Sequence, residues 1–272
     1  MLVSVSGPEE AHEALQGGAH IIDAKDPSVG SLGMVDSTSL RAIRSAVPSG
    51  HPLSVALGDG VSRQHVRRLI RTIEGKGVWF LKLGFAGTAD PSRAALLLSS
   101  AVAAARRWLG GPAVVAVGYA DWERAGSLNP NTLAEVAAEN GVKGFLLDTA
   151  FKDQGSLLGL WSEERIAGLV KRARRARLLM GLAGGMTLRD IPRAAALQAD
   201  IIGVRGAACD GGRAGRVSAQ RVAALRAALD GAVSSGSGRR LQPTLEVLDP
   251  DALAIEPGRE RLRKIRVGQS LS

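Results

Sequence analysis

The 272-residue sequence is 45% hydrophobic, which is enough to bury the core of one large domain or two small ones. Aromatic residues make up only 3%, which argues against a surface that stacks nucleic-acid bases. The single cysteine, Cys209, excludes an internal disulfide and a cysteine-rich metal site, and it fits a reducing cytoplasm.

The formal net charge of +9 comes mostly from arginines, in stretches such as 63–71 and 171–177. Because these stretches sit within helical Leu/Ala patterns, we expect the arginines on solvated helix faces, where their field would also favour an anionic substrate. The first residues lack the basic start and apolar core of a signal peptide, and no apolar run of about 18 residues predicts a transmembrane helix. We therefore expect a cytoplasmic protein without membrane contact.

Short β-rich segments alternate with helical patterns along most of the chain. Strands are predicted at residues 2–5, 20–25, 52–58, 78–84, 113–119, 144–150, 177–184 and 200–206. Helical patterns between them include 39–47, 95–109, 132–140, 162–176 and 219–229. This alternation predicts βαβ units with a parallel sheet, and near-continuous apolar strands indicate a sheet covered on both faces.

Eight strands in about 230 residues predict a (β/α)8 TIM barrel. An open doubly wound sheet is the alternative, but the first predicted turn, SVSGPEEA, has no GxGxxG motif. The pattern stops after Asp230, where GAVSSGSGRR (231–240) indicates a flexible linker. We thus predict a barrel domain over residues 1–230, followed by a linker and C-terminal extension over 231–272 whose role the sequence does not indicate.

Charged residues end the even-numbered predicted strands. They are Asp23 and Lys25 on the second, Lys82 on the fourth, Asp148 on the sixth and Arg205 on the eighth. Side chains inside such a barrel form layers drawn from alternate strands, and active groups sit where strands end, so these residues are expected to converge. Lys152 follows Asp148 in the next loop and is expected at the same rim.

Buried Asp–Lys ion pairs that only join strands are the simplest alternative for any one of these pairs. Three lysines and two aspartates at one rim are more than such joining requires. Neighbouring ammonium groups and partial burial lower the pKa of a lysine, and a neutral lysine attacks carbonyl groups to form a Schiff base. The pattern therefore predicts carbonyl chemistry of the aldolase or lyase kind, with lysine and carboxylate groups moving protons.

Two glycine-containing loops follow the seventh and eighth predicted strands, where such barrels often hold phosphate on backbone amides. Glycine also serves ordinary turns, so the position of these loops carries the argument. The predicted phosphate-binding residues are Gly184, Gly185, Arg205, Gly206 and Ala207.

Five motifs together resemble the (5-formylfuran-3-yl)methyl phosphate synthase family of methanofuran biosynthesis. They are IIDAKDPSVGSLG (21–33), FLKLG (80–84), AVGYAD (116–121), LLDTAFKDQG (146–155) and IIGVRGAACDGGR (201–213). The resemblance ends near residue 213, and the residues after about 230 lie outside it.

The resemblance implies a (β/α)8 barrel that condenses two glyceraldehyde 3-phosphate molecules to 4-(hydroxymethyl)-2-furancarboxaldehyde phosphate, with loss of phosphate and water. It also implies Lys25 as the Schiff-base lysine, Lys82 as the proton acceptor, and Asp23, Asp148 and Lys152 as surrounding acid–base groups. It implies no metal and no organic cofactor.

Two other functions remain open from the sequence. One is another Schiff-base aldolase or lyase acting on a small phosphorylated aldehyde or ketone. The other is a basic barrel that binds nucleic acid or protein with an inert, ion-paired rim, against which the scarcity of aromatic residues argues. We expect a phosphorylated triose as the partner, no nucleic acid, and a homo-oligomer, because barrels of this size often associate.

Overall fold

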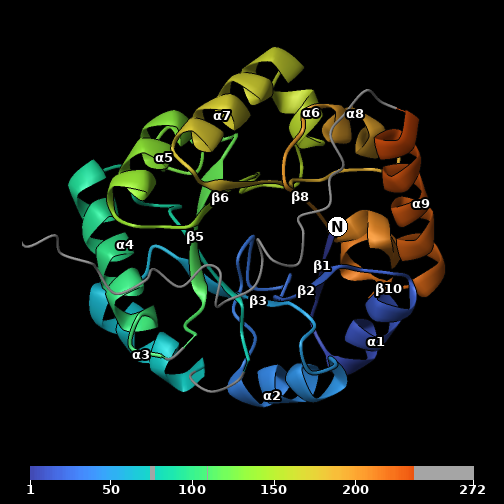
Figure 1. Ribbon diagram of the computed structural model, residues 1–272, viewed down its shortest axis with the longest axis horizontal. Coiled ribbons are helices and arrows are strands. Elements are labelled where there is room, and N and C mark those ends of the chain that lie inside the picture. The colour runs from blue at the N-terminus through green and yellow to red at the C-terminus, as the bar shows by residue number, and fades with distance from the viewer. Residues whose placement is uncertain (74–76, 109, 236–272) are drawn as a thin grey trace, which may run out of the picture.

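Eight parallel strands close into a barrel in the computed structural model, which describes residues 1–73, 77–108 and 110–235 (Figure 1). The strands are neighbours in chain order, and β8 closes the barrel by pairing with β1. Their bounds are β1 Leu2–Val5, β2 Ile21–Ala24, β3 Leu53–Asp59, β4 Phe80–Gly84, β5 Ala113–Tyr119, β6 Gly144–Asp148, β7 Leu179–Leu182 and β8 Ile201–Val204. Each predicted strand segment overlaps one of these strands, and the (β/α)8 barrel is confirmed.

Helices form the outer ring in Figure 1. They are α1 Pro8–Gln16, α2 Ser37–Ala46, α3 Arg63–Ile73, α4 Pro91–Ala105, α5 Pro130–Glu139, α6 Leu157–Leu160, α7 Glu163–Arg175, α8 Asp190–Ala196 and α9 Ala219–Ser235. The connection from β8 to α9 contains two short 3-10 turns, η1 Gly206–Ala208 and η2 Gly212–Ala214, and an antiparallel pair, β9 Cys209–Asp210 with β10 Arg216–Val217.

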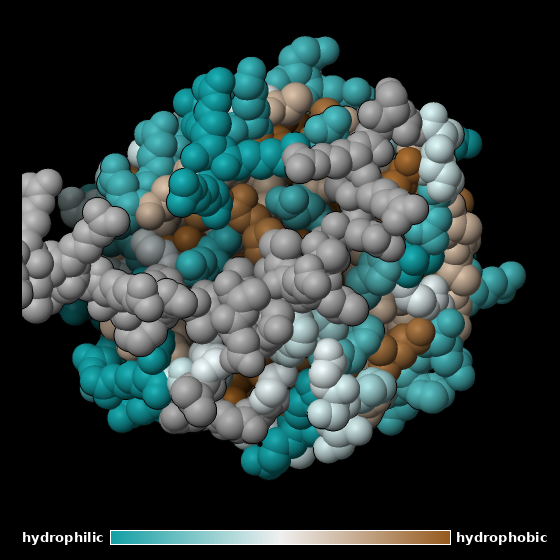
Figure 2. Space-filling view, in the orientation of Figure 1, coloured by the Kyte–Doolittle hydropathy of each residue, from teal (hydrophilic) through white to brown (hydrophobic). Residues whose placement is uncertain are grey.

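The basic helices turn their arginines to solvent, as the charge pattern predicts. In α3, Val66 and Ile70 are buried against the barrel, while Arg67, Arg68 and Arg71 are exposed. Helix α7 follows the same rule, and Figure 2 shows hydrophilic residues over that part of the rim. These charges add to the field of the molecule without joining the barrel interior.

Several helix boundaries differ from the sequence prediction, and two of the differences have a clear physical reason. Helix α4 begins at Pro91 rather than in the apolar run, because the Asp90 side chain accepts hydrogen bonds from the backbone N–H groups of Ser92 and Arg93 and so caps the helix. Helix α9 buries Leu229 just before the predicted linker and continues to Ser235, so the prediction of a flexible linker was wrong over 231–235, where the chain stays helical. The remainder of the predicted linker and extension lies outside the described residues.

The barrel interior is apolar at the end where the strands begin and also beside β3, β5 and β6. Leu2, Ile21, Phe80 and Ala113, at or near the starts of their strands, form one buried cluster. A second cluster packs residues of β3, β5 and β6 against Leu32 from the loop after β2. This packing supports the strand ends, where the charged residues lie.

We expect a chain that stops after Gly236 to keep the fold, because the eight strands and the helices packed on them lie within residues 1–235. Far-ultraviolet circular dichroism and thermal unfolding of the truncated and full chains should superimpose. Insoluble or non-cooperatively unfolding truncated protein would show that the removed segment belongs to the core or to an interface between copies.

Candidate active site

The Asp23 carboxylate lies at the centre of the charged group inside the barrel. It is fully buried on β2, and its Oδ2 accepts hydrogen bonds from the Ser4 hydroxyl at 2.8 Å and the Lys82 ammonium at 2.6 Å. Its other oxygen, Oδ1, is buried without a hydrogen-bond partner among the described residues. One carboxylate oxygen therefore holds Lys82 and Ser4, and the other stays buried next to them without a hydrogen bond.

Lys25 follows β2 directly and differs from the other lysines of the site. Its side chain is buried, but its ammonium makes no hydrogen bond or ion pair with any described residue. Burial and the nearby charge of Lys82 lower its pKa to about 7, against the opposing effects of Asp148 and Asp23. The lowered pKa makes the neutral amine, which is the nucleophilic form, accessible near neutral pH.

Asp148, buried at the end of β6, pairs with the half-buried Lys152 of the following loop. The Lys152 ammonium donates to Asp148 Oδ1 at 2.8 Å and to the hydroxyl and carbonyl oxygens of Thr149 at 2.9 and 2.5 Å. Burial by itself would raise the pKa of Asp148, but the charges of Lys152 and Lys25 and the hydrogen bonds hold it at about 2. Lys152 is thus a fixed cation, and Asp148 stays ionised beside Lys25.

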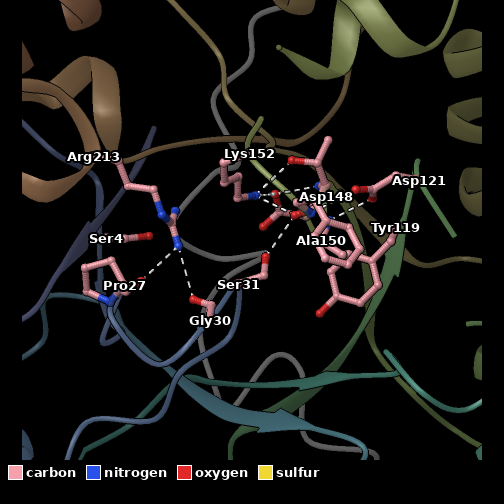
Figure 3. Close-up of polar contacts among 12 residues, drawn as sticks. Ser4, Pro27, Gly30, Ser31, Tyr119, Asp121, Asp148, Ala150, Lys152 and Arg213 are labelled. Atoms are coloured by element: carbon pink, nitrogen blue, oxygen red, sulfur yellow. Dashed lines mark hydrogen bonds and ion pairs between the residues drawn. The ribbon is translucent and has the colours of Figure 1, made fainter. Parts of the chain in front are cut away.

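The loop that carries Lys152 is held by residues to which the sequence analysis assigned no role (Figure 3). The buried Asp121 carboxylate accepts hydrogen bonds from the backbone N–H groups of Ala150 at 2.7 Å and Phe151 at 2.8 Å. The Ser31 hydroxyl, from the loop after Lys25, donates to the Thr149 carbonyl at 2.9 Å. The Asp121 bonds hold the loop after β6 to the end of β5, and the Ser31 bond ties it to the loop after β2, so the two lysines are fixed relative to one another.

A further carboxylate, Asp59, ends β3 and breaks the expected pattern of charges on even strands alone. Its Oδ1 accepts hydrogen bonds from the Tyr119 hydroxyl at 2.5 Å and the Ala86 backbone N–H at 3.1 Å. Burial raises the pKa of Asp59, and burial together with this carboxylate raises the pKa of Tyr119 well above its usual range. The pair joins β3, β4 and β5 at the barrel mouth.

A cavity of about 420 Å³ opens among these groups and reaches down to Leu2 and Ile201 on β1 and β8. Asp148 is the only carboxylate among the described residues that line it. Its cationic lining residues are Lys25, Lys82, Lys152, Arg205, Arg213 and Arg221. Positive charge in a concave site of this kind favours a small anionic molecule.

The predicted phosphate-binding glycines line the same cavity. Gly184 and Gly185 have φ angles of +108° and +57°, and a side chain at either would collide with the loop after β6. Their backbone N–H groups donate to no described carbonyl or side chain, so they are free for a ligand. Gly206 and Ala207 begin η1 at the cavity wall, also with free N–H groups among the described residues.

Arg205 lines the cavity, but its charge is engaged elsewhere. Its guanidinium pairs with Glu10 of α1 through both terminal nitrogens, and it also donates to the carbonyl oxygens of Ser4 at 3.1 Å and Gly215 at 3.2 Å. The pair is buried on both sides. Direct phosphate binding by Arg205 remains a prediction, and its observed contacts join β8 to α1.

The structure brings together every residue to which the sequence analysis gave a catalytic role. The motifs quoted for the resemblance also contain the residues without an assigned role, namely Ser31, Tyr119, Asp121 and Arg213. Within the residues that the structure describes, no group of His, Cys, Asp and Glu side chains is arranged to hold a metal ion. No helix in that part of the chain is long and apolar enough to span a membrane.

A closed (β/α)8 barrel with lysines and carboxylates gathered where its strands end is the arrangement of a barrel enzyme. More narrowly, the chain belongs to the 4-HFC-P synthase family, whose sequence profile matches residues 1–226. It is 39% identical over 213 residues to the (5-formylfuran-3-yl)methyl phosphate synthase of Methanopyrus kandleri, covering 78% of this chain and 90% of that protein. It is 35% identical to the synthase of the same name from Methanocaldococcus jannaschii, covering 83% and 97%.

Solved structures resemble this fold at low sequence identity. The 3-hexulose-6-phosphate synthase of Salmonella typhimurium superimposes with a TM-score of 0.60 at 16% identity, covering 85% of this chain and 98% of that one. The phosphoribosyl anthranilate isomerase of Thermotoga maritima gives 0.57 at 12% identity, covering 85% and 100%. These likenesses establish the barrel and nothing about its substrate.

We expect imine formation by this protein to depend on pH with a midpoint near the Lys25 pKa of about 7. Trapping of glyceraldehyde with cyanoborohydride should speed up as pH rises and level off above about pH 8, because only the neutral amine attacks. Lys82→Met should move the midpoint to higher pH, since the Lys82 charge lowers the Lys25 pKa. Lys171→Met, on the exposed face of α7, is the matched control, and a wild-type midpoint near 10 would contradict the assignment.

We expect Glu10→Gln to lower the free energy of unfolding by about 3 kcal/mol, because it leaves the buried Arg205 guanidinium without its countercharge. Urea unfolding measures this cost. Glu9→Gln changes the neighbouring, exposed carboxylate and should leave the unfolding midpoint in place. Equal effects of the two variants would mean that the pair adds nothing to stability.

Proposed function

We propose that this protein condenses two molecules of glyceraldehyde 3-phosphate to 4-(hydroxymethyl)-2-furancarboxaldehyde phosphate through a Schiff base on Lys25. One observation carries the proposal: a buried amine with a pKa of about 7 and no partner among the described residues faces a cation-lined cavity. The names of the related proteins support the furan product.

The first step is attack of the neutral Lys25 amine on the substrate aldehyde, followed by loss of water to give the imine. Asp148, ionised and beside Lys25, stabilises the positive charge of the protonated imine. The imine withdraws electrons from the adjacent carbon and so makes its C–H bond acidic. Nothing in this step requires a group outside the chain.

Proton transfer at that carbon is assigned to Lys82 and Asp23. Lys82 lines the cavity and its ammonium donates to Asp23 Oδ2 at 2.6 Å, so a proton removed from the substrate carbon is taken up by the pair, which then holds Lys82 as the cation and Asp23 as the neutral acid. The carbanion equivalent then either attacks the second aldehyde or expels phosphate from the neighbouring carbon. The fixed Lys152 cation and the free amides of Gly184 and Gly185 favour the anionic phosphate in either case.

Another Schiff-base lyase on a phosphorylated aldehyde or ketone is the second candidate, because the same lysine would serve it. An inert, ion-paired rim is not favoured by the structure, since Lys25 is buried among charges without an ion pair of its own. The product separates the two enzyme candidates: a furan absorbs in the ultraviolet, and an aldol sugar does not.

Incubation of the purified protein with glyceraldehyde 3-phosphate tests the proposal. We expect ultraviolet absorbance and free phosphate to rise together, and Lys25→Ala to lower both rates by at least about a thousandfold, as for removal of a covalent nucleophile. Lys82→Ala should still be labelled by the aldehyde and borohydride but should turn over poorly. Lys171→Ala, exposed on α7, should match the wild type.

Each departure from this result has a separate meaning. Furan formation that survives Lys25→Ala would remove the Schiff base from that residue. Borohydride labelling at Lys25 without furan would favour the other lyase. Full activity of Lys82→Ala would remove its role in proton transfer.

A further inference from the structure

One arginine of the cavity lining, Arg213, has no carboxylate partner among the described residues. It belongs to η2, in the long connection between β8 and α9, and its guanidinium is half-buried. The other two arginines of the lining are balanced: Arg205 by Glu10, and Arg221 by Asp210 at 2.5 Å. Arg213 is thus the arginine whose charge is left for a bound molecule.

The position of the Arg213 guanidinium is set by two backbone carbonyls. Its Nη2 donates to Pro27 at 3.4 Å and to Gly30 at 3.1 Å, and Figure 3 shows it extended toward these residues. Nε and Nη1 make no hydrogen bond with any described residue. Three N–H donors of a guanidinium fixed in place are therefore free beside the cavity.

We propose that Arg213 binds a phosphate group of the substrate. A half-buried guanidinium without a countercharge is costly to fold, and a doubly charged phosphate supplies both the missing charge and acceptors for the free donors. Burial lowers the pKa of Arg213 and the charge of Asp148 acts against this, and the guanidinium of an arginine stays charged in proteins. This inference rests on the proposed function in that the ligand is taken to be a phosphorylated small molecule.

Two features place this phosphate beside the reacting lysine. Lys25 begins the loop whose Pro27 and Gly30 carbonyls hold Arg213. The backbone of Arg213 lies 3.5–3.7 Å from where a side chain on Gly206 would begin, next to the free N–H groups of that turn. Because the guanidinium is already held in place, binding costs little side-chain entropy.

Glycerol 3-phosphate is the probe, because it carries the phosphate but has no carbonyl for Lys25. We expect Arg213→Gln to weaken its binding, measured by calorimetry, by at least about tenfold, the lower end for loss of a charged hydrogen bond. Arg213→Lys keeps the positive charge but lacks the planar set of guanidinium donors, so its affinity for the probe should lie between those of the wild type and Arg213→Gln. Arg67→Gln removes an exposed arginine of α3 that lies outside the cavity lining, and it should bind within about twofold of the wild type.

A second readout separates phosphate binding from a merely structural role of Arg213. In Arg213→Gln, cyanoborohydride trapping of glyceraldehyde should equal that of the wild type, while trapping of glyceraldehyde 3-phosphate at low concentration should fall by the same factor as probe binding. Equal losses with both aldehydes would show that Arg213 only holds the loop after β2 and would overturn the proposal.

Unchanged probe binding in Arg213→Gln, or no measurable binding by the wild type, would also overturn it. Arg213-dependent binding of the probe by an enzyme that forms no furan would leave this phosphate site standing and remove the proposed reaction. Furan formation by an enzyme whose probe binding does not depend on Arg213 would support the proposed reaction and remove this phosphate site. The two proposals can therefore be tested independently.

Discussion

The 2.6 Å contact between Lys82 and Asp23 is the interaction around which the barrel interior is arranged. The desolvation cost of two opposite charges inside a protein is offset by their attraction and hydrogen bonds, and here the pairing uses one ammonium and one carboxylate oxygen. A second pair, Lys152 with Asp148, is satisfied in the same way. The third ammonium, on Lys25, lies among these charges but pairs with none of them. Because the carboxylates are already paired with other lysines, Lys25 is the amine that loses its proton most easily.

The strands were predictable because buried parallel strands appear as short apolar runs. Asp23 on β2 and Lys25 just after it are two residues apart, so both face the same side. Charges on β2, β4, β6 and β8 could be expected to meet because alternate strands share layers. The end of α9 was missed because GAVSS is poor in apolar residues, and helix continuity there depends on packing against neighbouring elements. The apolar run alone predicts a start of α4 at residue 95, whereas the cap Asp90 and the following Pro91 mark the true start.

The remaining site residues could not be assigned from sequence for a different reason. Asp121, Ser31 and Arg213 act through backbone groups of loops that are distant in the chain, and no spacing rule connects a carboxylate at 121 with amides at 150 and 151. The choice between Arg205 and Arg213 likewise depends on which of them meets Glu10, a residue of α1 about two hundred positions away. Such assignments need three-dimensional neighbours, not residue types.

The barrel interior is also divided, and this division has an evolutionary consequence. Leu32, from the loop after Lys25, is packed with Tyr119 and residues of β3, β5 and β6, whereas much of the cavity borders β1, β7 and β8. Substitutions in the loops after β7 and β8 can change the shape of the cavity without disturbing the packed residues beside Lys25. In such a barrel, substitutions near β7 and β8 can change the substrate. Selection for a stable fold meanwhile preserves the packing beside the reactive lysine.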